Sequence, residues 1–198
     1  MTFVLLLSGK AGSGKDAIAS ILCDEYRFQR LAFADSLKED FAAANGISVD
    51  VLHDSELKWA YRPLLIQHAT EARAIDIDVY AKAVVAQIGK GRYVISDWRL
   101  LAEESYLRKT LKDVTFVTAR VERLTGARAR PFLWTSDSSK NHYTETELDT
   151  VNFDVRIVND GTIKDLREAI RYQLVPKLKT PEGGPTCVSG EDAPATSK

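Results

Sequence analysis

The chain has 198 residues, a length that suits one α/β domain of ordinary size. Hydrophobic residues make up 44% of it and charged residues 28%, a composition that excludes wholesale disorder. The 27 lysines and arginines almost balance the 28 aspartates and glutamates. Composition therefore predicts no general attraction to nucleic acid or to an anionic membrane, and any anion site must be local.

Compartment and membrane attachment follow from the cysteines and the apolar runs. Cys23 and Cys187 lie too far apart to suggest a disulfide framework, which favours a reducing compartment. The apolar run at 3–7 is far too short to cross a bilayer, and no basic leader precedes it. We therefore expect a soluble, cytoplasmic protein with no membrane partner.

Five short apolar segments alternate with amphipathic ones along the chain. The first strand is expected at 2–7, and the helix after it is expected to run to about Tyr26. Residues 47–55 are expected to form a loop, and Pro63 is placed where a first turn or kink of a helix would be. Further strands are expected at 28–33, 93–95, 114–117 and 153–158, and further helices near 37–44, 56–73, 79–88, 100–107 and 162–174.

This alternation predicts the fold. Short buried strands that alternate with helices are typical of a five-stranded parallel sheet covered by helices on both faces, a three-layer α/β/α arrangement. We expect this domain to span residues 1–179. After it, residues 180–198 are rich in Pro, Gly, Ser and Thr, which predicts a disordered tail.

The strongest chemical signal follows the first strand directly. The run Gly9-Lys10-Ala11-Gly12-Ser13-Gly14-Lys15-Asp16 matches the phosphate-binding pattern G-x4-G-K at every position but the last, where Asp stands in place of Ser or Thr. Glycines let successive backbone N–H groups converge on phosphate oxygens, and the following helix adds its positive end. Lys15 can follow the β- and γ-phosphates of ATP as their charge shifts. The run predicts a P-loop that binds ATP.

Two acidic residues are candidate ligands for the Mg²⁺ that accompanies ATP. Asp16 can bind Mg²⁺ directly or through water, or it can simply stabilise the start of the helix. Asp97 ends the strand Tyr93-Val94-Ile95-Ser96, the form of a Walker B element, and can hold Mg²⁺ or meet the acceptor. Arg99, two residues further on, is a candidate to bind a phosphate through both nitrogens of its guanidinium.

Four arginines lie within eleven residues after the fourth strand: Arg120, Arg123, Arg128 and Arg130. They form either a solvated basic face or a mobile lid, at about 120–150, that closes over the phosphates and excludes water. On the second hypothesis Arg120 binds ATP, whereas Arg128 and Arg130 act in catalysis.

The acceptor is expected to bind in a segment inserted at about 35–90, between the second and third strands. Asp35, Lys38, Arg62 and Arg73 are the candidates there, and the two arginines suit a dianionic phosphate. Trp98 is a candidate to stack on a base, although aromatic residues are more often part of a core.

These blocks together resemble the phage-type deoxynucleoside monophosphate kinases, a family of P-loop kinases. Beyond the P-loop, the resemblance rests on Phe33-Ala34-Asp35-Ser36-Leu37-Lys38, Arg62-Pro63-Leu64-Leu65, Ile95-Ser96-Asp97-Trp98-Arg99 with Glu103, Glu145-Thr146-Glu147-Leu148-Asp149, Phe153-Asp154, and Ile157-Val158-Asn159-Asp160-Gly161-Thr162. It implies a nucleoside-kinase-like fold and transfer of the γ-phosphoryl of Mg·ATP to a deoxynucleoside 5′-monophosphate, giving a diphosphate and ADP. It further implies that Arg99 contacts phosphate, that Asn159 lies near the ATP base, and that a phage-encoded copy acts in the host cytoplasm.

Two differences from that family bear on the acceptor. Ala102 stands where Asn is frequent before the acid at Glu103, and the Trp that is common near Tyr80 is absent. The animal-type phosphomevalonate kinases are the alternative, because they are similar in the P-loop, in Leu37-Lys38-Glu39 and in the Ser-Asp-x-Arg element at 96–99. A nucleotide-binding regulatory module without transferase activity is the alternative of another class. The sequence does not decide between a monomer and a homodimer.

Overall fold

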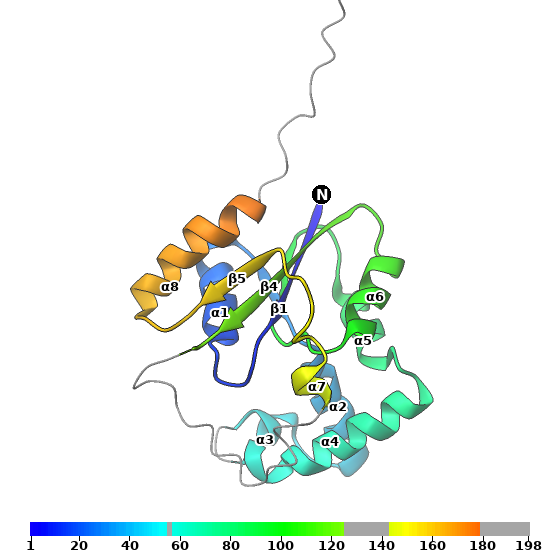
Figure 1. The fold of residues 1–198 in the computed structure, drawn as a ribbon. Helices are drawn as coiled ribbons and strands as arrows, with labels where there is room; N and C mark the ends of the chain where they lie inside the picture. The colour runs from blue at the N-terminus through cyan, green and yellow to red at the C-terminus, as the bar shows by residue number, and fades with distance from the viewer. Residues whose placement is uncertain (55–56, 125–142, 179–198) are drawn as a thin grey trace, which may run out of the picture.

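The computed structural model describes residues 1–54, 57–124 and 143–178, without the side chains of residues 58, 59, 143 and 145. Its centre is the predicted five-stranded, all-parallel sheet (Figure 1). The order of the strands in the sheet is β2-β3-β1-β4-β5. The longest strand pairing joins β1 and β4. It begins with Thr2 opposite Val114 and ends with Ser8 opposite Arg120. The strands are β1 (Thr2–Ser8), β2 (Gln29–Leu31), β3 (Arg92–Ile95), β4 (Val114–Glu122) and β5 (Val155–Val158).

Helices cover both faces of the sheet, which gives the expected three layers. In Figure 1, α1 and α8 lie on one side of the sheet, α5 and α6 lie on the other, and α2, α3 and α4 gather below it. The helices are α1 (Lys15–Tyr26), α2 (Phe33–Asn45), α3 (Val49–His53), α4 (Lys58–Ile75), α5 (Val79–Gln87), α6 (Leu101–Thr110), α7 (Tyr143–Thr146) and α8 (Ile163–Ala169), which continues as the π turn η2 (Ile170–Leu174) and the 3-10 turn η3 (Val175–Leu178).

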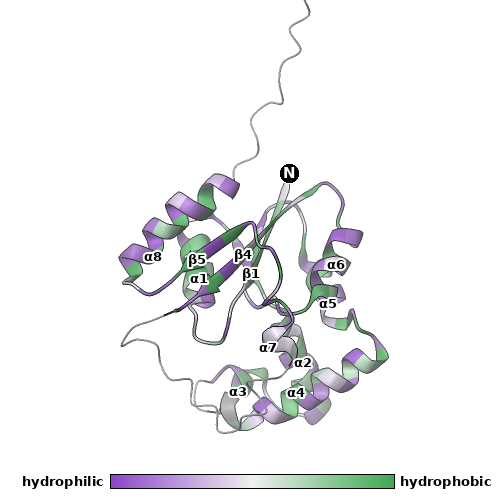
Figure 2. Ribbon diagram, in the orientation of Figure 1, coloured by the Kyte–Doolittle hydropathy of each residue, from purple (hydrophilic) through white to green (hydrophobic). Residues whose placement is uncertain are grey.

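The side chains of β1 show how the sheet divides the core. Phe3, Leu5 and Leu7 pack into one cluster with α1 and α8, whereas Val4 and Leu6 pack into a second cluster on the opposite face. Successive residues of a strand point to opposite faces, so a strand covered on both sides must be apolar throughout. Figure 2 agrees, since hydrophilic colour dominates α8 on the outside while hydrophobic colour gathers in α1 beneath it.

Three expectations about local structure are wrong. The strand expected at 28–33 is only Gln29–Leu31, because Phe33 already begins α2. Residues 47–55 are not a loop throughout, because Ser48 caps the short helix α3 with its side chain. The fourth strand extends to Glu122, which places Arg120 in the sheet rather than in a lid. Pro63 lies inside α4, so of the two places expected for it, a first turn or a kink, the first turn is excluded.

Some predictions fall outside the described residues. These are the tail at 180–198, Cys187, and the lid arginines Arg128 and Arg130. Within the part of the chain that the structure describes, no helix is both long and apolar enough to cross a membrane.

Candidate active site

The P-loop forms the turn between β1 and α1. Gly12 and Gly14 have φ values of 76° and 104°, in the left-handed region that side chains other than glycine rarely adopt. A Cβ atom on Gly14 would also collide with the side-chain amide of Asn159. Gly14 caps α1, and Lys15 is the first residue of that helix. The glycines of the motif are therefore required by the backbone path and by the close approach of a neighbouring loop.

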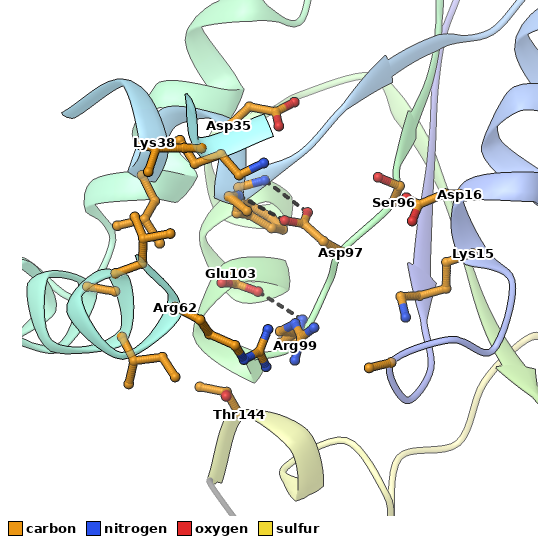
Figure 3. A pocket seen from close by; sticks show the side chains of 18 of the residues that line it. Lys15, Asp16, Asp35, Lys38, Arg62, Ser96, Asp97, Arg99, Glu103 and Thr144 are labelled. Atoms are coloured by element: carbon orange, nitrogen blue, oxygen red, sulfur yellow. Dashed lines mark hydrogen bonds between the residues drawn. The ribbon is translucent and has the colours of Figure 1, made fainter. Parts of the chain in front are cut away.

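The ammonium group of Lys15 lies within the turn. Its Nζ atom donates to the carbonyl oxygens of Gly9 at 2.7 Å and Lys10 at 3.0 Å. Lys15 is only 8% exposed, yet it lines the pocket described below, and Figure 3 shows its side chain extending toward that pocket. The loop thus holds a positive charge at the place where the sequence predicts the phosphates of ATP.

Asn159 supports the P-loop through a hydrogen bond to its backbone. Its Nδ2 atom donates to the carbonyl of Ser13 at 2.8 Å, and its own backbone N–H donates to Glu122 at 2.8 Å. Its carbonyl accepts a hydrogen bond from Nε of Arg123 at 3.0 Å. Asn159 is buried, so its observed contact is with the backbone of the loop. Its nearness to an ATP base stays a prediction.

Asp149 joins the P-loop to the sheet. It accepts hydrogen bonds from Nζ of Lys10 at 2.8 Å and from Nη2 of Arg120 at 2.6 Å. Arg120 is buried and also donates to Oγ of Ser8 at 3.0 Å. Burial opposes ionisation of Asp149, but the two cations outweigh it and lower the pKa of the carboxyl below its usual value. In this arrangement Lys10 and Arg120 hold the loop in place, and their contact with ATP stays a prediction.

A pocket of about 450 Å³ connects the P-loop to the predicted acceptor segment. Among its described lining residues, six carry a positive charge and four are carboxylates. The predicted acceptor residues Asp35, Lys38, Arg62, Arg73 and Asp97 all line it. Four residues of the predicted P-loop also line it, together with two residues that flank Asp97: Ala11, Gly12, Lys15, Asp16, Ser96 and Arg99. Segments far apart in the sequence therefore share one cavity, as the labelled side chains of Figure 3 show.

Asp97 links the end of β3 to the start of α2. Its two carboxylate oxygens accept the backbone N–H groups of Phe33 at 2.9 Å and Ala34 at 2.8 Å. The N-cap of α2 is Ala32, which has no polar side chain, so Asp97 supplies the cap from 64 residues away. Burial raises the pKa of Asp97 above its usual value, and the hydrogen bonds from the two backbone amides offset part of that rise. Asp97 thus fixes the helix that carries Asp35 and Lys38 to the pocket.

The oxygen donors at this junction fit a magnesium ion. Asp16, Ser96 and Asp97 line the same pocket, and Figure 3 shows Asp16 and Ser96 near Lys15, with the Asp97 carboxylate directed toward the start of α2. Ser96 is 1% exposed, and within the described residues its hydroxyl has no hydrogen-bond partner. Mg²⁺ is commonly bound through one or two carboxylates together with substrate phosphates and water. Among the described residues, no cluster of three or more His, Cys, Asp or Glu could hold a metal ion by itself.

The pocket also contains residues that the sequence argument missed. Arg30 lines it and pairs with Asp35 at 2.8 Å, and Thr144 of α7 lines it as well. Glu103 was noted only as part of a family motif, but it is a buried carboxylate in the pocket wall. The position of Glu103 three residues after the expected helix start near 100 is the sequence signal for this role. An acid at that position often accepts hydrogen bonds from the first backbone amides of the helix.

Trp98 does not face the pocket. It is 1% exposed, its Nε1 atom donates to the carbonyl of Leu100 at 2.8 Å, and its ring lies 5.6 Å from that of Phe153. Tyr80 is likewise buried in the core on this side of the sheet. The expectation that Trp98 stacks on a substrate base is therefore not met, and the side chain serves the core instead.

The chain is similar to several solved structures. TT1252 from Thermus thermophilus is 14% identical, over 90% of this chain and 99% of that chain, with a TM-score of 0.53. Shikimate kinase from Aquifex aeolicus is 14% identical, over 86% and 94% of the two chains, with a TM-score of 0.43. An APS kinase from Mycobacterium tuberculosis in complex with AMPPNP and APS is 15% identical, over 90% and 98%, with a TM-score of 0.47. At such identities the likeness concerns the fold alone.

A family-level comparison is more specific. A family model described as phosphomevalonate kinase matches residues 7–113, which is more than half of the chain. The matched segment contains the P-loop, α2, the arginines of α4 and the element at 96–99, all of which line the pocket. The match supports the second of the two resemblances that the sequence suggested rather than the first. The chain belongs to the phosphomevalonate kinase family.

Proposed function

We propose that this protein transfers the γ-phosphoryl group of Mg·ATP to the phosphate of phosphomevalonate, with ADP as the second product. The observation that carries the proposal is the continuous pocket, which has Lys15 of the P-loop at one side and Arg62 and Arg73 of α4 at another. A kinase needs two anion sites that open into one cavity, because the donor and acceptor phosphates must meet. The family match independently favours this acceptor.

The character of the pocket wall supports phosphomevalonate over a nucleotide. Among the described lining residues Phe33 is the only aromatic one, whereas the other apolar members are aliphatic: Leu37, Leu52, Leu65, Ile66, Ala34 and Ala69. A nucleobase is usually held by aromatic stacking or by amide groups, while a branched aliphatic acid needs an aliphatic wall. Phosphomevalonate also has a carboxylate and a phosphate, and the cations on α2 and α4 can bind these two anionic ends.

The chemistry requires positioning and charge neutralisation more than proton transfer. An acceptor phosphate is already ionised at neutral pH, so no general base has to act. Lys15 would neutralise charge on the transferring group, and Arg99 would bind the group as it moves to the acceptor. Bound Mg²⁺, held by Asp16, Asp97 and Ser96, would supply further charge neutralisation on the phosphates. Arg128 and Arg130 stay candidates for the same role, outside the described residues.

The direct test is a coupled assay of ADP release by the purified full chain. We expect release that depends on phosphomevalonate, with little release in the presence of any of the four common deoxynucleoside monophosphates. Turnover of a deoxynucleoside monophosphate alone would replace the acceptor assignment with the first resemblance. Binding of ATP without transfer to any of these acceptors would instead indicate the regulatory module.

Arg62→Ala tests the acceptor side of the pocket. We expect the KM for phosphomevalonate to rise by about tenfold or more, since one charged hydrogen bond contributes about 1.5–3 kcal/mol. The KM for ATP should change little. Arg108→Ala is the matched control, because Arg108 pairs with Glu104 on α6 and does not line the pocket. An equal rise in both KM values for Arg62→Ala would contradict its assignment to the acceptor.

A further inference from the structure

Glu103 is an ionisable side chain to which the proposed reaction assigns no role. It lies in the first turn of α6, it is 4% exposed, and it lines the pocket. Burying a carboxylate is costly unless other groups compensate for the lost water. Its partners should therefore reveal what the charge is for.

The first carboxylate oxygen of Glu103 fixes the chain at Arg99. Oε2 accepts the backbone N–H groups of Arg99 at 3.1 Å and Leu100 at 3.0 Å (Figure 3). The N-cap residue of α6 is Leu100, whose side chain cannot accept a hydrogen bond. Glu103 thus holds the turn between Asp97 and α6, and it sets the backbone from which the Arg99 side chain extends into the pocket.

The second oxygen faces a different element. Oε1 lies 3.5 Å from Nη2 of Arg73 on α4, and the guanidinium of Arg73 also lies over the ring of Tyr80, with 5.1 Å between its Cζ atom and the ring centroid. Arg73 is mostly buried as well, with its side chain 16% exposed. Capping of α6 accounts for the contacts of Oε2, but it does not account for an ion pair with a residue 30 positions away on another helix.

We propose that Glu103 is a positioning residue that orients Arg99 and Arg73 toward one anionic group of the acceptor. This rests on the proposed function, since it assumes that the pocket takes an anionic acceptor. A guanidinium that is already oriented loses less conformational entropy when it binds an anion than one that is free to rotate. The Oε1 atom of Glu103, 3.5 Å from Nη2 of Arg73, also offsets part of the positive charge of that arginine before the acceptor arrives.

A role as general base is the competing assignment for Glu103. The geometry disfavours it, because Oε2 already accepts two backbone amides and Oε1 faces a cation. The proposed acceptor phosphate also has no proton that must be removed at neutral pH. A base is recognised by a fall in kcat that follows its protonation, whereas a positioning residue affects mainly the KM of the ligand that its partners bind.

The kinetic test compares Glu103→Gln with Glu104→Gln. In the first variant the side-chain amide can keep an oxygen for the backbone N–H groups of residues 99 and 100, but the charge that faces Arg73 is lost. We expect the acceptor KM to rise by about tenfold, with kcat within about threefold of the wild type and the ATP KM unchanged. Glu104 is the matched control, since it pairs with Arg108 on the same helix and does not line the pocket. An unchanged acceptor KM, or a loss confined to kcat, would overturn the proposal.

A double-mutant cycle with Arg73→Ala separates positioning from simple loss of stability. If Glu103 acts through Arg73, the double variant should bind the acceptor almost as weakly as Arg73→Ala alone. Fully additive losses would mean that the two residues act independently, which contradicts the proposal. Thermal unfolding of all variants shows whether each remains folded at the assay temperature.

A binding experiment keeps this test separate from the proposed function. Inorganic phosphate is titrated into the nucleotide-free full chain while the Nε–Hε signals of the arginine side chains are followed by NMR, with Arg→Lys variants for assignment. We expect phosphate to shift the signals of Arg73 and Arg99, and to shift them at about tenfold higher concentration in Glu103→Gln. The Nε signal of Arg108, bonded to Glu104 at 2.7 Å, is the internal reference. Equal titration curves in both proteins would overturn the proposal, whichever acceptor the enzyme turns over.

Discussion

The P-loop region and the acceptor wall of this molecule are built in different ways. The P-loop is contiguous, since eight consecutive residues, from the end of β1 into the first turn of α1, contain the glycines, Lys15 and Asp16. The acceptor wall is assembled from α2, α4, the end of β3 and the start of α6. Its arginines, Arg62, Arg73 and Arg99, span 37 positions of the sequence but line one pocket.

Both regions nevertheless depend on a side chain from a distant segment. Asn159 donates to the carbonyl of Ser13 and so holds the P-loop, whereas Asp97 accepts the amides of Phe33 and Ala34 and so holds α2. In each case a backbone group at a helix start or turn finds its partner in another part of the fold. Local motifs supply the reacting groups, and long-range polar contacts set their directions.

The largest expected effect removes the charge of the P-loop. Lys15→Ala should lower kcat by about 100- to 1000-fold, the usual cost of removing one preorganised donor from a charged transition state. The fold should persist, because the hydrogen bonds of Nζ to Gly9 and Lys10 stay within the loop itself. Thermal unfolding and the coupled assay measure these two properties. Lys112→Ala, at the opposite end of the strands, is the control, and near-normal turnover of Lys15→Ala would contradict the role of the lysine.

The free energy of unfolding should depend on pH through Glu103 in the acceptor wall. Burial, with the nearby charge of Asp97 adding to it, raises the pKa of Glu103 to about 7, against about 4.3 in an unfolded chain. Because the folded pKa is the higher one, this group stabilises the fold fully below about pH 4 and loses that contribution as the pH rises through about 7. The loss is on the order of 3 kcal/mol.

Denaturant unfolding at a series of pH values measures this contribution. Glu103→Gln has no proton to lose, so its free energy of unfolding should fall less than that of the wild type between about pH 4.5 and about pH 8. Glu104→Gln should follow the wild type. Parallel curves for the wild type and Glu103→Gln would show that the carboxyl titrates as it does in the unfolded chain.

The smallest expected effect concerns the support of the P-loop. Asn159→Ala should lower the free energy of unfolding by about 1–3 kcal/mol, because the buried carbonyl of Ser13 loses its donor. The ATP KM should rise while the acceptor KM stays near the wild-type value. Asn45→Ala is the matched control, since Asn45 also donates to a carbonyl at 2.8 Å but lies at the end of α2. A larger change in the acceptor KM than in the ATP KM would contradict the division into two regions.

Several features of the fold and site follow from local sequence patterns. The runs at 2–7 and 93–95 are strands because they are apolar throughout, as strands covered on both faces must be. Thr162 and Asp165, three residues apart at the start of the last expected helix, form the reciprocal pair of hydrogen bonds that this spacing favours. The predicted acceptor candidates on α2 and α4 do line the pocket.

Other features could not follow from local patterns. The edge strand β2 is mostly exposed and only three residues long, so the strand expected at 28–33 is longer than the observed one. The start of α2 at Phe33 depends on Asp97. In the same way, the position of the Arg120 side chain depends on Asp149, and that of Glu103 depends on Arg73. These partners are 29 to 64 residues apart, beyond the reach of helix or strand periodicity.

The sequence by itself determined the succession of the five strands and the longer helices along the chain and the presence of a phosphate-binding turn, because backbone preferences and hydrophobic periods act between near neighbours. Only the tertiary structure decided which charged groups face the cavity and which serve as supports. Arg120 and Arg99 both follow an apolar strand segment, yet one is buried against Ser8 and Asp149 and the other lines the pocket. The reason is physical: the direction of a charged side chain depends on which opposite charge or backbone amide the packed fold brings within hydrogen-bond distance.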